Sequence, residues 1–126
     1  MSKQFSDLGI SEVLLKGLSD LNISVPTEIQ EKSIPDLLGK KDDFVGLAKT
    51  GTGKTLAFGL PLLQLIDTDN KNIQAVILVP TRELGHQIYD NMMAFSKYQD
   101  KLSIAAPAEG FRLNRKLNAL LSLHML

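Results

Sequence analysis

The eight residues from Ala48 to Thr55 read Ala-Lys-Thr-Gly-Thr-Gly-Lys-Thr, with the types and spacing of a phosphate-binding loop. Two closely spaced glycines, Gly51 and Gly53, let the backbone turn without Cβ clashes and direct successive N–H groups at an anion. Lys54 then reaches terminal phosphates with its ammonium group, and Thr55 offers a hydroxyl group to a Mg²⁺ ion. We therefore expect Lys54 and Thr55 to be the catalytic residues of this loop, and Thr55 to be its metal ligand.

An alternative interpretation of this segment is a glycine-rich turn in which Gly-Lys-Thr occurs by chance. Alanine occupies position 48, where the strict pattern has glycine, and this small residue departs little from the pattern. The pattern is a strong signal of phosphate binding when a strand precedes the loop and a helix follows it. The flanking segments therefore decide between the two interpretations.

Both flanks favour phosphate binding. Residues 44–47 predict a buried strand that runs directly into the loop, and residues 54–66 predict a largely apolar helix kinked at Pro61. The continuous apolar run at residues 75–79 predicts a second strand, buried on both faces. A strand, a long crossover and another strand imply a parallel pair, so the predicted fold class is α/β.

Further elements are predicted on both sides of this unit. A helix is expected after Ser11, its N-cap. A second helix opens at residues 27–30, and Pro35 must break or kink it. Residues 82–98 predict a third helix, and residues 102–105 predict a third strand.

Composition limits the classes of protein that fit. The chain has 126 residues, enough for one domain at most, and 44% of them are hydrophobic. Lys and Arg number 14, as do Asp and Glu, so no overall basic charge indicates nucleic-acid binding. The absence of cysteine excludes disulfides and thiolate zinc sites. With no apolar run long enough to cross a bilayer, we expect a cytoplasmic protein without a membrane partner; the sequence does not predict an oligomeric state.

Three segments, in order, resemble motifs of the DEAD-box RNA helicases. Residues 26–30 (Pro-Thr-Glu-Ile-Gln) resemble the Q motif of that family, and Phe5 lies 17 residues before Asn22, the first position of the motif, as the family's upstream aromatic does. The family prefers glycine at the position of Asn22 and an aromatic residue at the next. The loop at 48–55 matches their phosphate loop, and residues 80–84 (Pro-Thr-Arg-Glu-Leu) match their next motif letter for letter.

This resemblance, which covers residues 3–105, implies a three-layer, RecA-like P-loop NTPase fold with a parallel sheet, of which only the first portion is present. It implies ATP and Mg²⁺ as cofactors. The Gln30 amide would bond the Hoogsteen edge of adenine, and the Phe5 ring would stack on the base. The implied ATP-binding residues are Phe5, Thr27, Gln30, Ala48, Lys49, Thr50, Gly51, Thr52, Gly53, Lys54 and Thr55.

The two residues assigned to adenine also have simpler interpretations. Gln30 lies three residues after Thr27, so it could complete a capping box. Phe5 could be a hydrophobic anchor for the first helix.

The motif at residues 80–84 implies contact with RNA. In the family it binds the phosphate backbone of single-stranded RNA, which we assign here to Pro80, Thr81 and Arg82. Helix-end amides and one guanidinium group can bind phosphate without reading bases. The alternative is an ordinary transition from strand to helix.

Residues 106–126 do not resemble the family and could form an amphipathic helix, with leucines at 113, 117, 120 and 121 on one face. One hypothesis is a reading-frame shift after about residue 105, because a shifted frame over residues 111–119 can encode a string typical of the family. The Asp-Glu-Ala-Asp segment, which holds Mg²⁺ in these enzymes, is absent from the 126 residues. We therefore expect this chain to bind nucleotide weakly without hydrolysing it. The alternatives are another P-loop NTPase, such as a kinase, and an inactive truncated product.

Overall fold

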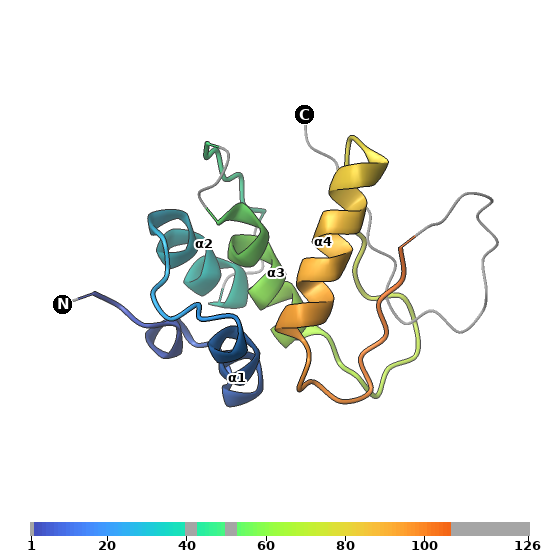
Figure 1. The fold of residues 1–126 in the computed structure, drawn as a ribbon, viewed down its shortest axis with the longest axis horizontal. Coiled ribbons are helices and arrows are strands. Elements are labelled where there is room, and N and C mark those ends of the chain that lie inside the picture. The colour runs from blue at the N-terminus through green and yellow to red at the C-terminus, as the bar shows by residue number, and fades with distance from the viewer. Residues whose placement is uncertain (1, 40–42, 50–52, 107–126) are drawn as a thin grey trace.

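The structure is a computed structural model that describes residues 2–39, 43–49 and 53–106. Its elements are a short 3₁₀ helix, η1 (Phe5–Leu8), and four α-helices: α1 (Glu12–Asp20), α2 (Glu28–Gly39), α3 (Lys54–Leu65) and α4 (Arg82–Phe95). Figure 1 shows α3 between α2 and α4, with η1 and α1 packed across their lower ends. No helix in these described ranges is long and apolar enough to span a bilayer.

The first two helices begin where the sequence predicts. Ser11 is the N-cap residue of α1, although its side chain makes no capping hydrogen bond. The α2 helix begins at Glu28 and continues through Pro35 to Gly39, so Pro35 does not break it. The proline removes the hydrogen bond to the carbonyl group of Glu31. The long contact between α2 and α3, the most extensive between two elements, compensates for this loss.

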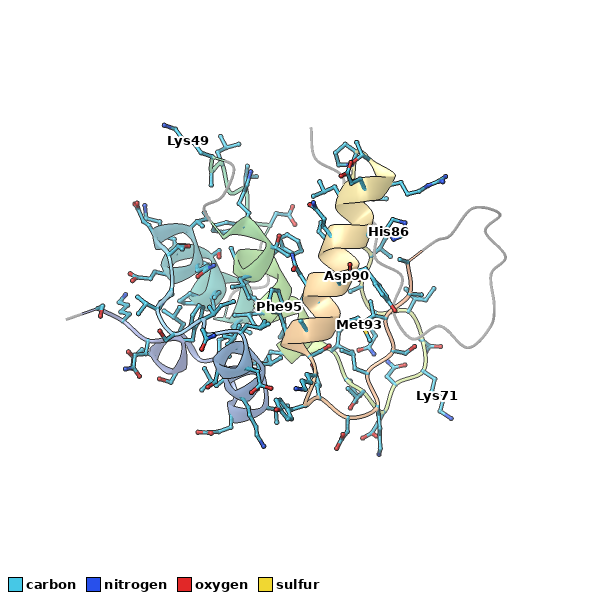
Figure 2. All side chains as sticks on the ribbon, viewed as in Figure 1. Lys49, Lys71, His86, Asp90, Met93 and Phe95 are labelled. Carbon is cyan, nitrogen blue, oxygen red and sulfur yellow. The ribbon has the colours of Figure 1, made fainter. Side chains whose placement is uncertain are left out.

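The α3 and α4 helices are confirmed with slightly earlier ends than predicted, at Leu65 and Phe95. Pro61 lies inside α3 and is buried. The apolar side of α4 faces α3: Phe95 is 5% exposed, whereas its near neighbour Met93 is 47% exposed (Figure 2). The alternation of buried and exposed residues around α4 is what a helix with one covered face requires.

A single hydrophobic core joins all five elements. Its largest fully buried side chains come from η1, α1, α2, α3 and α4 in turn: Phe5, Leu14, Leu18, Ile34, Leu60, Leu63 and Met92. The close packing depends on glycines at helix crossings. A Cβ atom at Gly17 of α1 would collide with the carbonyl oxygen of Phe95, and one at Gly59 of α3 would lie 2.8 Å from the Met92 sulfur.

The predicted sheet is not confirmed, because the described residues contain no strand and only one isolated bridge, at Ala105. Burial of the strand at residues 44–47 was predicted wrongly, since Val45 is 84% and Leu47 is 92% exposed. At residues 75–79, Ile77 is buried, but Val76 and Leu78 are 54% and 44% exposed, so burial on both faces was also wrong. The physical reason is the same in both segments: no neighbouring strand in the described part of the chain covers these side chains.

An exposed polar cluster ties the end of α1 to the segment after α4. Tyr98 donates a hydrogen bond from its hydroxyl group to Asp20, and Lys97 reaches the same carboxylate at 3.1 Å. The Lys16 ammonium lies 4.6 Å from the centre of the Tyr98 ring. The hydrogen bond from Tyr98, followed by that from Lys97, holds the pKa of Asp20 below its ordinary value. This cluster supports the α1–α4 contact from the surface.

The backbone contact at Gly17 generates a test of the fold. Alanine normally stabilises a helix interior by about 1 kcal/mol relative to glycine. In Gly17→Ala the new methyl group meets the Phe95 carbonyl, and overpacking of this kind costs about 1–3 kcal/mol, so we expect a net loss of stability in urea unfolding followed by circular dichroism. Gly39→Ala is the matched control, because a Cβ atom there has no neighbour within 4 Å. A Gly17→Ala protein as stable as the parent would contradict the packing of α1 on α4.

Candidate nucleotide and RNA site

Those predicted phosphate and RNA residues that the structure describes lie at one end of the molecule. Figure 1 shows α3 and α4 running in the same direction, with both N-termini at the upper end of the view. Residues 43–49 lie at that end too, and Lys49 is labelled there in Figure 2. A helix N-terminus carries partial positive charge and unpaired N–H groups, so this end of the fold offers two sites for anions.

Gly53 begins the phosphate end of α3. It is the N-cap residue, its φ is +83°, and no side chain caps the helix there. The first-turn N–H groups therefore have no side-chain acceptor at the N-cap, which leaves them suited to an anionic ligand. Lys54 and Thr55 follow as the first two residues of the helix, both half-buried. Ala48 is half-buried and Lys49 exposed, while the predicted ligands Thr50, Gly51 and Thr52 lie outside the described residues.

Gln30 connects this helix end to α2. Its Nε2 donates to the carbonyl oxygen of Gly53 at 3.0 Å, and its Oε1 accepts from the N–H group of Thr27 at 2.9 Å. The bond to Thr27 confirms the capping interpretation of Gln30. The adenine interpretation stays a prediction; each amide atom retains capacity for one further hydrogen bond, although the side chain is only 2% exposed.

The same contact explains why position 53 needs glycine. A Cβ atom there would collide with Gln30 Nε2 and would lie 3.2 Å from Thr27 Oγ1, and the positive φ disfavours any other residue. One turn further along both helices, the hydroxyl group of Ser33 donates to the Ala57 carbonyl at 2.9 Å, and Ser33 is 1% exposed. Two buried side chains of α2 thus fix the phosphate end of α3.

Phe5 lies in the hydrophobic core with 2% of its surface exposed, as an anchor of the first helices would. It also borders a cavity of about 510 Å³, whose lining includes Asn22 and Ile23 but neither Thr27 nor Gln30. Phe5 and Gln30 therefore do not both line this cavity. Asn22 has a φ of +57°, a conformation that glycine adopts freely and asparagine tolerates, which explains how asparagine fits where the Q motif prefers glycine.

The predicted RNA residues Pro80, Thr81 and Arg82 are all exposed. Thr81 is the N-cap of α4, and its hydroxyl group accepts a hydrogen bond from the Leu84 N–H at 3.2 Å. Arg82 is the first residue of the helix. The Thr81 cap confirms that this motif starts a helix, and it leaves an exposed guanidinium group at the positive end of α4.

Metal binding has no preassembled site in the described ranges. No group of three His, Asp or Glu side chains among these residues could hold a metal ion. His86 lies exposed on α4 (Figure 2), whereas His124 is outside the described residues. Thr55 stays the predicted Mg²⁺ ligand, a role that also needs the oxygens of a bound phosphate.

Sequence reasoning missed two polar residues whose side chains form hydrogen bonds between distant elements. Ser33 is a polar residue on the buried side of α2, and Gln64 on α3 bonds the backbone of the η1–α1 turn at 2.8 and 2.7 Å. Polar residues at apolar helical positions were the available signal. Their partners, 24 and 53 or more residues away in the chain, could not be identified from the sequence.

A protein-family model described as DEAD/DEAH box helicase matches residues 27–126. The ATP-dependent RNA helicase DeaD of Haemophilus influenzae is 44% identical over 92% of this chain, and CshA of Limosilactobacillus reuteri is 48% identical over 75%. The chain spans about a fifth of each relative, 19% in both cases. The family match extends through the residues after 105, which were expected to be atypical.

Solved structures show the same fold. A DEAD box protein from Methanococcus jannaschii superposes with a TM-score of 0.83 at 32% identity, over 96% of this chain and 34% of that one. S. cerevisiae Dbp5 bound to RNA and ADP BeF3 also gives a TM-score of 0.83 at 32% identity, over 95% of this chain and 31% of its own. The helices described above are thus arranged as in these proteins.

The Gly53–Gln30 contact can be tested by a double-mutant cycle. In Gly53→Ala, the left-handed φ costs about 1–2 kcal/mol and the methyl group displaces the Gln30 amide, so we expect a clear drop in the urea midpoint. With Gln30→Ala already present, the steric part disappears, and the second substitution should cost less. Strict additivity of the two losses would contradict the contact.

Proposed function

Because this chain belongs to the DEAD/DEAH box helicase family, we propose that it forms the nucleotide-binding part of an ATP-dependent RNA helicase. The observation that carries the proposal is the junction of α2 and α3. There a left-handed Gly53 precedes Lys54 and Thr55 at an N-terminus without a side-chain cap, and Gln30 bonds Gly53 directly. This arrangement suits a triphosphate at the helix end and a base on the side of α2.

Each residue has one task in this proposal. The α3 N–H groups and the Lys54 ammonium hold the phosphates, and the Thr55 hydroxyl is a ligand of Mg²⁺. The ion, when bound, neutralises charge on the terminal phosphates. Gln30 recognises the adenine edge, with Thr27 beside it. Phe5 stacks on the base, the remaining loop residues 48–52 surround the phosphates, and Lys54 and Thr55 are the catalytic residues of the complete enzyme.

The 126 residues alone are proposed to bind ATP weakly and not to hydrolyse it. The carboxylate segment that positions Mg²⁺ in complete enzymes of this family is absent from them. Residues 1–105 make up the nucleotide-binding unit in this proposal, and residues 106–126 follow it within the range that the family model matches. The segments at 44–47, 75–79 and 102–105 become parallel strands of a RecA-like sheet in the complete protein. A kinase function has no comparable support, because the family match and the relatives are helicases.

We propose RNA as the macromolecular partner. The exposed Thr81-Arg82 start of α4 lies at the same end of the fold as the phosphate residues (Figure 1). A guanidinium group and helix-end N–H groups bind the phosphate backbone irrespective of sequence. The bound RNA of Dbp5, a structure with the same fold, supports this assignment.

Binding of ATP tests the function. We expect Lys54→Ala to weaken ATP binding about tenfold or more, because a charge-assisted phosphate contact is lost. Gln30→Ala should abolish the preference for ATP over GTP. Isothermal titration of both nucleotides measures these effects, and Lys32→Ala, an exposed lysine paired with Glu28 on α2, is the charge-matched control. Failure of the parent chain to bind ATP would refute the proposal, and release of phosphate that depends on Lys54 would refute the lack of hydrolysis.

Binding of single-stranded RNA tests the role of Arg82. We expect Arg82→Ala to weaken binding of an oligoribonucleotide and to lower the slope of log affinity against log salt by about 1, since one phosphate contact is lost. Fluorescence anisotropy at several salt concentrations measures both. Lys71→Ala removes one charge at the opposite end of the fold, as Figure 2 shows. Equal effects of the two substitutions would indicate a general charge effect and contradict the assignment.

A further inference from the structure

Gln64 links two parts of the molecule that are far apart in sequence. It lies in the last turn of α3 and is half-buried. Its Oε1 accepts from the Ser11 N–H at 2.8 Å, and its Nε2 donates to the Gly9 carbonyl at 2.7 Å. Both polar ends of one amide are therefore used on a single turn of backbone, between η1 and α1.

The Gln64 amide takes the place of a local capping interaction at the start of α1. In a capping box, a Glu or Gln side chain at the third helical position accepts from the N-cap N–H group. The third position of α1 is Leu14, which has no acceptor, and the Ser11 side chain makes no capping bond. Gln64 accepts from the Ser11 N–H instead, from a helix 53 residues away. The start of α1 is consequently fixed to α3 rather than to itself.

Backbone hydrogen bonds connect this turn to Phe5. Between Gly9 and Ser11, the N–H group of Ile10 donates to the Phe5 carbonyl at 3.4 Å, and the Gly9 N–H donates to Ser6 at 3.2 Å. Phe5 and its neighbours Gln4 and Ser6 line the cavity of about 510 Å³. Gln64 thus fixes one wall of that cavity against α3.

The other end of α3 carries the phosphate residues. Lys54 and Gln64 are ten residues apart, which corresponds to about 15 Å along a helix. Gln30 and Ser33 attach the N-terminal end of α3 to α2. Gln64 attaches the last turn of α3 to residues 5–11, which we call the Phe5 segment. A helix held at both ends sets the distance between the backbone that carries Phe5 and the phosphate end of α3.

We propose that Gln64 is a positioning residue that sets the place of the Phe5 segment relative to the phosphate end of α3, so that base and phosphates of one nucleotide are bound together. This inference rests on the proposed function. Its consequence is specific: loss of the Gln64 amide weakens binding of ATP, whereas binding of a phosphate chain without a base is unaffected.

Gln64→Met tests this consequence, because methionine keeps the unbranched shape and removes both hydrogen bonds. ATP and inorganic tripolyphosphate are titrated into the parent and variant chains. We expect ATP affinity to fall about five- to tenfold, the equivalent of one or two net hydrogen bonds, and tripolyphosphate affinity to stay within about twofold. Gln74→Met is the matched control. The Gln74 amide bonds the backbone N–H and carbonyl groups of Asp67 with the same two atoms, at 2.8 and 2.7 Å, but within one loop. It should change neither affinity.

Ser11→Pro removes the same bond from the other side. Ser11 has a φ of −70°, which proline adopts, and its side chain makes no capping bond. Proline lacks the N–H group that Gln64 accepts, so ATP affinity should fall without a change for tripolyphosphate. Combined with Gln64→Met, it should add little further loss. If Gln64→Met does not fold by circular dichroism, Ser11→Pro decides the question.

The outcomes separate the two proposals. A parent chain that does not bind ATP overturns the proposed function and, with it, the role of Gln64. A parent that binds ATP, together with variants that bind it equally well, overturns the positioning role alone. Equal losses for ATP and tripolyphosphate, or additive losses in the double variant, show a merely structural residue and overturn it too.

Discussion

The hydrogen bond from Gln30 to the Gly53 carbonyl is the interaction on which the arrangement of the site depends. It joins two segments 23 residues apart at the point where α3 begins. Since Gln30 also accepts from the Thr27 N–H, a single buried side chain fixes the start of α2 and the start of α3 together. Burial raises the free-energy cost of breaking either bond, because an unsatisfied amide in the interior costs about 1–3 kcal/mol.

The central helix α3 receives polar contacts on each side. Ser33 of α2 donates a hydrogen bond to a backbone carbonyl of α3, and Gln99 donates to the Leu63 carbonyl of α3 at 2.8 Å. Gln64, in the last turn of α3, donates to the backbone of the turn between η1 and α1. Hydrophobic packing alone would allow helices to slide past one another, because it has no direction. Directional bonds at the beginning and end of α3 fix its register against its neighbours.

The helices could be predicted from the sequence because their signals are local. Periodic apolar residues and caps such as Thr81 lie within one or two turns of the element that they define. Pro35 was predicted to break or kink its helix, and it does not break α2. Whether a proline breaks a helix depends on tertiary packing, here against α3, which lies outside any local window. The apolar run at 75–79 was predicted as a strand buried on both faces, and the structure has no strand there. The pairing and burial of a strand depend on neighbours that local sequence does not specify.

The candidate site divides in the same way. Residue types at 53–55 and the helix starting after Thr81 follow from spacing. The double use of the Gln30 amide, the burial of Phe5 and the contacts of Gln64 arise from pairs distant in sequence. The sequence therefore indicates residue types suited to a nucleotide, whereas the partners that these side chains bond in the folded chain depend on contacts that local sequence does not specify.

The exposure of Val45 and Leu47, at 84% and 92%, has a consequence for the behaviour of the chain in solution. Two large aliphatic side chains in contact with water favour association between molecules, and the formal net charge of zero at pH 7 provides little repulsion to oppose it. Salts such as sulfate strengthen apolar association. The short segment that leads into the phosphate-binding loop thus also contributes to the tendency of these 126 residues to associate.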